Sequence, residues 1–138
     1  MEAETGNFPL LDGSDARYRI KHEVVEDVLV VTPMAADLDD EATIGPLREE
    51  LHALLRRPLP RRVVLNLEYV THLTGRAIGL FVAHHLRLDR AGGALRIGGV
   101  QARVMALLDQ VRLPVLIDCN PSVDAAVLDP WPSVPSAS

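Results

Sequence analysis

The residues best suited to recognition lie in a short turn, Thr74-Gly75-Arg76, downstream of an apolar run. Residues 63–65 read Val-Val-Leu, which is typical of a strand covered on both faces, and helical spacing follows the turn. A turn between a buried strand and a helix N-terminus is where α/β domains commonly place their working residues. Because the turn contains no acid, cysteine or serine, it favours binding over catalysis.

Two residues of this turn each have two interpretations. Arg76 either contacts an anionic group on a partner or ligand, or is a solvated surface side chain. A cation at the positive end of a helix is slightly unfavourable, which argues for the binding role. Thr74 is interpreted first as the helix N-cap, and second as a displaced phosphorylation site.

An acidic loop contains Asp37, Asp39, Asp40 and Glu41. A calcium loop needs a glycine at its sharp turn, and this loop has none. We therefore expect Asp39 or Asp40 to cap the following helix, with Glu41 at the positive end of that helix.

The remaining polar residues predict no metal, cofactor or catalytic site. His84 and His85 are adjacent on a predicted helix and point about 100° apart, so they do not suit one metal ion. We expect His85 to be partly buried and His84 to be exposed. Cys119 has no resolving cysteine and is expected to be an ordinary, partly buried thiol, while Gly98-Gly99 lacks the spaced glycines of a phosphate loop.

Composition limits the class of protein. A length of 138 residues favours one domain, and 48% hydrophobic residues suffice for one core. Only 4% are aromatic and the net charge is −5, which argues against nucleic-acid binding. A single cysteine excludes an intrachain disulfide, and no apolar stretch approaches about 20 residues, so we expect a cytoplasmic protein without a membrane span.

Hydrophobic periodicity predicts strands that alternate with helices. Residues 1–16 are expected to form a flexible arm, 17–129 the folded domain and 130–138 a flexible tail, with Trp131 able to dock. The predicted strands are 17–22, 28–32, 62–67, 94–98 and 115–117, and the predicted helices are 41–55, 76–89, 101–110 and 123–128. This order predicts an α/β domain with a mixed, mostly parallel sheet of about five strands and about four helices.

Several segments carry a family resemblance in their order and spacing. They are 62–67 (Arg-Val-Val-Leu-Asn-Leu), 70–73 (Val-Thr-His-Leu), 77–81 (Ala-Ile-Gly-Leu-Phe), and Gly92-Gly93 before a strand. Together they resemble the STAS domain, the fold of bacterial anti-sigma-factor antagonists and of transporter tail domains. The resemblance covers residues 17–129.

The turn differs from the family pattern. In the antagonists it reads Asp-Ser-Ser-Gly, and the second serine is phosphorylated by a kinase that is also the anti-sigma factor. Here Thr74 stands at the aspartate, Gly75 at the first serine, Arg76 at the acceptor serine and Ala77 at the glycine, while Asn66 stands at an aspartate of the strand. The resemblance thus implies a STAS domain without the usual phosphorylation switch.

The resemblance and the residues together predict a non-catalytic interaction module that binds a protein. The expected partner is an anti-sigma factor that is a serine kinase, or another STAS protein. The predicted contact residues are Thr74, Gly75, Arg76, Ile78, Asp37, Asp39 and Asp40. The alternatives are a constitutive scaffold and, third, a small-molecule enzyme or nucleotide-binding domain, for which no converging polar set is evident.

Overall fold

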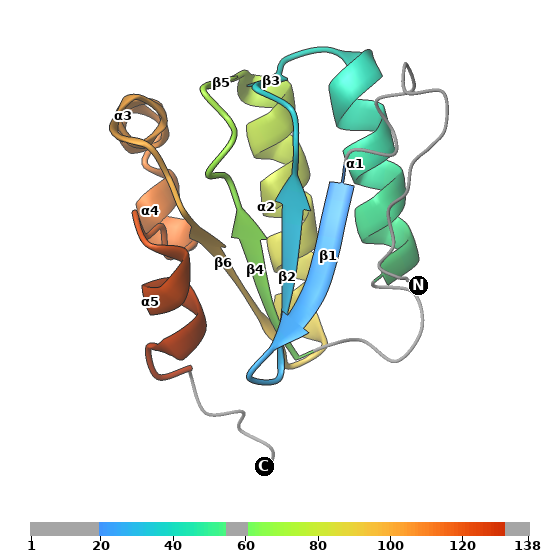
Figure 1. Cartoon of the computed structure of the whole chain (residues 1–138), viewed down its shortest axis with the longest axis vertical. Coiled ribbons are helices and arrows are strands. Elements are labelled where there is room, and N and C mark those ends of the chain that lie inside the picture. Colours follow the sequence, from blue (N-terminus) through green and yellow to red (C-terminus); the bar gives the residue numbers. More distant parts are fainter. Residues whose placement is uncertain (1–19, 55–60, 132–138) are drawn as a thin grey trace.

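A mixed β-sheet forms the centre of the molecule. The computed structural model describes residues 20–54 and 61–131, and in these residues one sheet has four strands in the order β1-β2-β4-β6 (Figure 1). The strands are β1 (Ile20–Val25), β2 (Val28–Pro33), β4 (Arg62–Asn66) and β6 (Ala94–Gly98). The β1–β2 pair is antiparallel, and β2, β4 and β6 are parallel, as the sequence predicted.

A tight turn joins β1 to β2. Its two residues, Glu26 and Asp27, both have positive φ, at 54° and 67°. Such a turn matches the right-handed twist of a hairpin. Residues 17–19 of the first predicted strand lie outside the described residues, and so do the predicted arm, Leu55 and residues 132–138 of the predicted tail.

Two further strands are very short. β3 (Asp37–Leu38) and β5 (His72–Leu73) pair in parallel to form a separate two-stranded sheet beyond the end of the main one. The sequence did not predict them, because two residues are too few for a periodic pattern. Their pairing nevertheless positions the candidate site.

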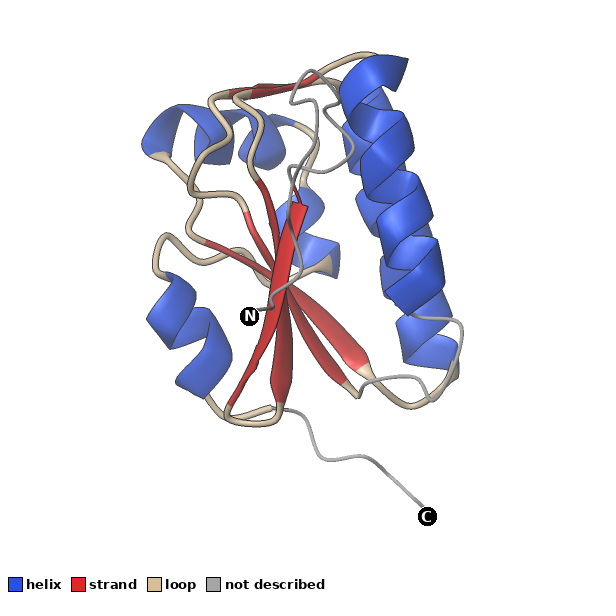
Figure 2. Cartoon of the chain, turned by 45° about the vertical axis from the view of Figure 1, so that its right-hand side comes forward, coloured by secondary structure: helices blue, strands red, loops and turns tan. Residues whose placement is uncertain are grey.

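Helices cover both faces of the main sheet (Figure 2). They are α1 (Glu41–Leu54), α2 (Gly75–Arg90), α3 (Ala102–Gln110), α4 (Leu113–Leu116) and α5 (Val123–Leu128). α1 and α2 pack over one face, where Leu65 of the sheet joins the larger apolar core. α5 packs over the other face, where the neighbouring Val64 joins a smaller cluster. Because adjacent strand residues face opposite sides, an unbroken apolar run in β4 fits burial on both faces.

The predicted strand at 115–117 is wrong. The chain there begins with the short helix α4, and Val115 is 86% exposed. Pro114 lies in the first turn of this helix, where the missing N–H of proline costs no hydrogen bond. After this helix the chain pairs with the sheet through a single-residue bridge between Cys119 and Ile97 of β6. Val111, at the end of α3, is likewise exposed.

Candidate functional site

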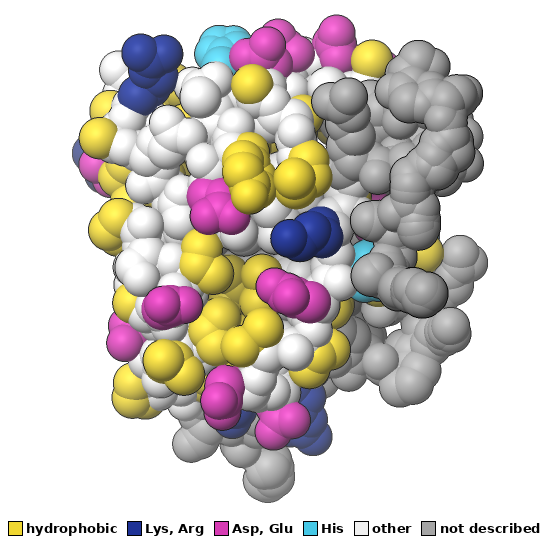
Figure 3. All heavy atoms as spheres, in the orientation of Figure 1, with side chains coloured by type: hydrophobic (Ala, Val, Ile, Leu, Met, Phe, Trp, Pro, Cys, Tyr) yellow, Lys and Arg dark blue, Asp and Glu magenta, His cyan; other side chains and the backbone are white. Residues whose placement is uncertain are grey.

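The small sheet brings together the two segments predicted to bind a partner. Asp37 pairs with His72, and the carbonyl of Ala36 accepts hydrogen bonds from the backbone N–H of Thr71 (2.7 Å) and His72 (3.1 Å). The N–H of Thr74 donates to the carbonyl of Leu38 at 3.2 Å. The acidic loop and the start of α2 therefore form one continuous face, although more than 30 residues separate them in the chain. Acidic side chains lie at this end of the molecule, and others are spread over the rest of the face drawn in Figure 3.

Thr74 occupies the N-cap position of α2 but does not cap it with its side chain. Its carbonyl accepts from the N–H of Ile78 at 3.1 Å, and its backbone is extended. The hydroxyl oxygen is buried and has no hydrogen-bond partner among the described residues. A kinase could reach this oxygen only if the turn opened. Gly75 is exposed and Ile78 partly buried.

Arg76 is exposed, with 60% of its side chain accessible, but its charge is already paired. Its Nη2 donates to Oε1 of Glu41 at 3.1 Å, and Arg48 donates to Oε2 of the same carboxylate at 2.8 Å. Hydrogen bonding to Arg48, with the charges of Arg48 and Arg76, lowers the pKa of Glu41. This ion-pair triad links the first turns of α1 and α2. A Cβ on Gly45 would lie 2.8 Å from Glu41 Oε2, so the glycine makes room for the carboxylate.

Asp40 is the residue that caps α1. Its Oδ1 accepts from the N–H of Thr43 at 3.3 Å, and its carbonyl accepts from the N–H of Ile44 at 2.8 Å. The sequence left the cap open between Asp39 and Asp40, and the geometry selects Asp40. Asp37 is exposed and Asp39 partly exposed. Within the described part of the chain, no three His, Cys, Asp or Glu residues are placed to hold a metal ion.

A protein-family model described as the STAS domain matches residues 19–126. The chain belongs to the STAS domain family. No curated protein matches the chain. Among solved structures, a putative anti-sigma factor antagonist from Thermotoga maritima superposes with a TM-score of 0.70 at 16% identity, covering 81% of this chain and 94% of that one. An anti-sigma factor antagonist from Mycobacterium paratuberculosis gives 0.69 at 18% identity, covering 78% and 89%.

A sulfate transporter family protein from Wolinella succinogenes is also similar, with a TM-score of 0.62 at 15% identity over 75% of this chain and 84% of that one. At these identities the likeness shows the fold alone. In the part of this STAS domain that the structure describes, no helix is long and apolar enough to cross a membrane.

Asn66, which follows the buried strand β4, has a structural role in this STAS domain. Its Nδ2 donates to Thr32 Oγ1 at 3.2 Å, and its Oδ1 accepts from the N–H of Glu68 at 3.0 Å. Gly99 has a φ of 69°, and a Cβ there would lie 2.4 Å from Asn66 Oδ1. Asn66 therefore shapes the turn that follows β4, and Gly99, in the loop after β6, packs closely against it.

The prediction for the two histidines of α2 is half wrong. His85 is partly buried, as expected, but His84 is only 5% exposed. The buried stripe of α2 runs through Leu80, His84 and Leu88, four residues apart. The sequence interpretation chose His85 instead of His84 for this buried side of the helix. Burial, together with the nearby charge of Arg87, lowers the pKa of His84 to about 4, so its imidazole is neutral.

Cys119 is a partly buried thiol, as predicted. Its S–H donates to the carbonyl of Ile117 at 3.3 Å. Burial, with smaller effects from Asp118 and Asp109, raises the pKa of the thiol to about 12. The group is therefore protonated and unreactive near neutral pH.

Arg96 in β6 was missed by the sequence analysis. The Arg96 side chain is buried, with 7% of the residue exposed. Its guanidinium donates to the carbonyls of Ala126 and Asp129 at 2.9 Å each, and to the carbonyl of Pro130. The guanidinium carbon lies 3.9 Å from the ring centroid of Trp131. Its Nε is 3.5 Å from Oδ2 of Asp118.

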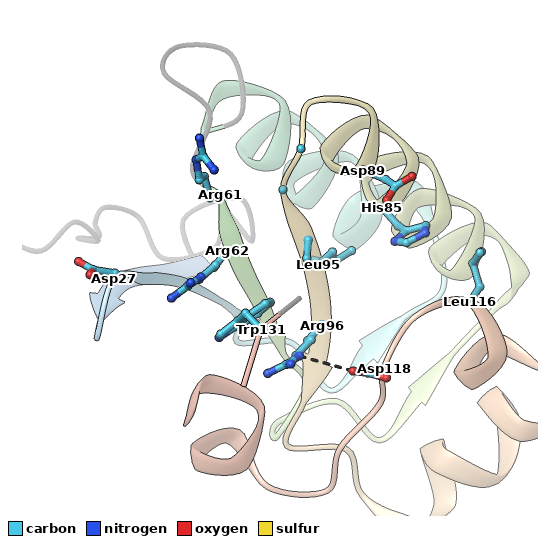
Figure 4. Close-up of a pocket in the computed structure, with 13 residues that line it drawn as sticks. Asp27, Arg61, Arg62, His85, Asp89, Leu95, Arg96, Leu116, Asp118 and Trp131 are labelled. Carbon is cyan, nitrogen blue, oxygen red and sulfur yellow. Dashed lines mark ion pairs between the residues drawn. The ribbon is translucent and has the colours of Figure 1, made fainter. Parts of the chain in front are cut away.

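A cavity of about 700 Å³ lies against this arginine (Figure 4). Arg96 and Trp131 lie on one side of it, while His85 and Asp89 enter from α2. Because the Arg96 guanidinium is bonded to the carbonyls of residues 126–130, it anchors the segment that follows α5. The predicted docking of Trp131 is real, and its Nε1 donates to the carbonyl of Val127 at 3.0 Å.

Proposed function

We propose that this STAS domain is a non-catalytic, cytoplasmic interaction module that binds a protein partner through the face formed by the acidic loop and the start of α2. The observation that carries the proposal is the β3–β5 pairing, which joins both segments into one surface. Solved anti-sigma factor antagonists with the same fold support a protein as the partner. The contact residues proposed are Asp37, Asp39, Asp40, Thr74, Gly75, Arg76 and Ile78.

The face has a defined charge pattern that a partner would match. Asp37 and Asp40 are exposed and present negative charge, while Arg76 stands beside them with its guanidinium partly shared with Glu41. A partner with basic side chains opposite the loop and an acid near Arg76 would be complementary. The partner we propose is an anti-sigma factor of the serine-kinase class, or another STAS protein.

We further propose that phosphorylation at this turn does not control binding. Residues 71–79 contain no serine, and the Thr74 hydroxyl is buried. A module of this kind is always competent to bind, which leaves constitutive scaffolding as its second candidate role.

The test is binding of the purified chain to anti-sigma kinases encoded beside its gene, measured by biolayer interferometry. Arg76→Glu should abolish binding, because it places a carboxylate against Glu41 and reverses the charge at the start of α2. Arg90→Glu is the matched control, since Arg90 is exposed at the other end of α2, away from the face. Binding retained by Arg76→Glu, with a native circular dichroism spectrum, overturns the proposed surface.

The regulatory part is tested separately. The chain is incubated with the kinase and ATP, and its intact mass is measured. An unmodified mass supports the unswitched module. A phosphate mapped to Thr74 or Thr71 overturns it without affecting the assignment of the face.

A further inference from the structure

We propose that a groove between α1 and α2 binds a small amphiphilic carboxylate, meaning a carboxylate group carried on a short aliphatic body. This site borders the protein-binding face and shares Arg76 with it, but the inference does not depend on the proposed function. The groove has a volume of about 390 Å³. Its apolar lining comes from Ile44 of α1 and from Leu80 and Ala83 of α2.

The charge of the groove is opposite to that of the whole chain. Arg48, Arg76 and Arg87 line it, and none of the described residues that line it is acidic. The chain as a whole carries 19 acidic residues against 14 basic ones. Arg48 and Arg76 share a single carboxylate, so the pair keeps a net positive charge beside the apolar floor, which favours an anionic ligand. The planar guanidinium fork matches a carboxylate in particular.

The molecule itself shows that these arginines accept a carboxylate. Arg48 and Arg76 hold the Glu41 carboxylate at 2.8 and 3.1 Å. That carboxylate is exposed, and the Arg48 and Arg76 side chains are 44% and 60% accessible. Donor positions on both arginines therefore remain open to a second anion, and Glu41 fixes the two side chains at the groove in advance. Such preorganisation reduces the entropy that a ligand must overcome.

A buried polar atom adds an independent observation. His84 lines the groove and is 5% exposed, and its Nδ1 has no hydrogen-bond partner among the described residues. His52, from α1, meets His84 edge to face, with ring centroids 6.3 Å apart. Buried polar groups are normally paired, so an unpaired one beside a groove is the expected mark of a missing ligand oxygen or its water. A neutral imidazole and an apolar floor suit the uncharged body of the ligand and the polar atoms close to it.

The size of the groove limits the ligand. A volume of about 390 Å³ is near the lower end of small-molecule sites. The site therefore suits a single short chain with one charged head better than a nucleotide. Octanoate is the probe. Octylamine, with an alkyl chain of the same length and a head group of opposite charge, is the control.

The experiment is isothermal titration of the full chain with octanoate and with octylamine. We expect saturable binding of octanoate and none of octylamine. Ala83→Trp should fill the groove from the exposed side of α2 and reduce octanoate affinity by on the order of tenfold or more. Leu86→Trp, a large substitution at an exposed residue of the same helix, should leave it unchanged.

A second pair of variants keeps the test independent of steric effects. Arg48→Gln should weaken octanoate binding by about tenfold, as expected for losing one charged hydrogen-bond donor, while Arg103→Gln should have no effect. Equal binding of octanoate and octylamine, full binding by Ala83→Trp, or no saturable octanoate binding overturns the proposal. So does binding of an acidic peptide without binding of octanoate, which would assign the groove to a protein.

Discussion

Replacing Arg96 by methionine tests whether one buried arginine holds the end of the domain. Methionine keeps the apolar contacts of the long side chain and removes the guanidinium. In the wild type that group donates to the carbonyls of Ala126, Asp129 and Pro130 and covers the Trp131 ring. The substitution therefore separates the role of the charge from the role of packing.

The expected loss of stability depends on which carbonyl groups remain buried once the guanidinium is removed. Asp129 and Pro130 are exposed, so water replaces the arginine at their carbonyls. Ala126 is buried, and an unpaired carbonyl there costs about 1–3 kcal/mol. Loss of the contact with the Trp131 ring adds about 0.5–1 kcal/mol. The free energy of unfolding should therefore fall by about 3 kcal/mol.

The chain contains a single tryptophan, so its fluorescence reports on this site alone. In Arg96→Met we expect Trp131 emission to shift to longer wavelength, with a lower urea midpoint in the same titration. Arg103→Met, at an exposed arginine of α3, is the control for loss of a positive charge. An unchanged emission maximum, together with a stability change below about 0.5 kcal/mol, would refute the anchoring role.

Four further predictions concern single positions. The pKa of His84 falls from 6.5 to about 4 on folding, so between these pH values the unfolded chain binds a proton that the folded chain does not. The free energy of unfolding should therefore decrease as the pH falls from 6.5 to 4, by up to about 3 kcal/mol. His84→Leu should remove most of this pH dependence in urea titrations. Gly99→Ala should destabilise the fold by about 1–2 kcal/mol because of its positive φ. Gly79→Ala, in the open interior of α2, should instead stabilise it by about 0.5–1 kcal/mol in the same assay. With its thiol pKa raised from 9.0 to about 12, Cys119 should react with iodoacetamide at pH 8 on the order of a thousandfold more slowly than in urea, and equal rates would contradict the burial described.

The strands and helices that sequence predicted correctly are those with strong local patterns. The apolar run of β4 and the Gly92-Gly93 end of α2, where Gly92 has a φ of 85°, depend on neighbouring residues alone. The α4 error has a local cause too, because the apolar residues 115–117 fit either a strand or a helix, and the tertiary structure favours the helix.

The role of Arg96 could not be predicted in this way. Its partners are backbone carbonyls 30 to 34 residues away. Every residue has a backbone carbonyl, so the residue types in a sequence do not indicate which carbonyls will bind an arginine. The candidate face depends on tertiary structure in the same way. The acidic loop and the start of α2 lie side by side because β3 and β5 pair. A sequence gives no signal for two strands of two residues each. The groove between α1 and α2 was not predicted from the sequence either, because the arginines that line it come from two different helices.

The second, smaller apolar cluster indicates how the protein would begin to unfold and aggregate. Val28, Val30 and Val64 on one face of the sheet are covered by α5, a helix of six residues that is too short to persist in water unaided. If α5 detaches, it leaves a bare valine surface on neighbouring strands while the rest of the sheet is still intact. Such surfaces adhere to one another, so the shelf life of concentrated samples should be set by this one helix rather than by global melting.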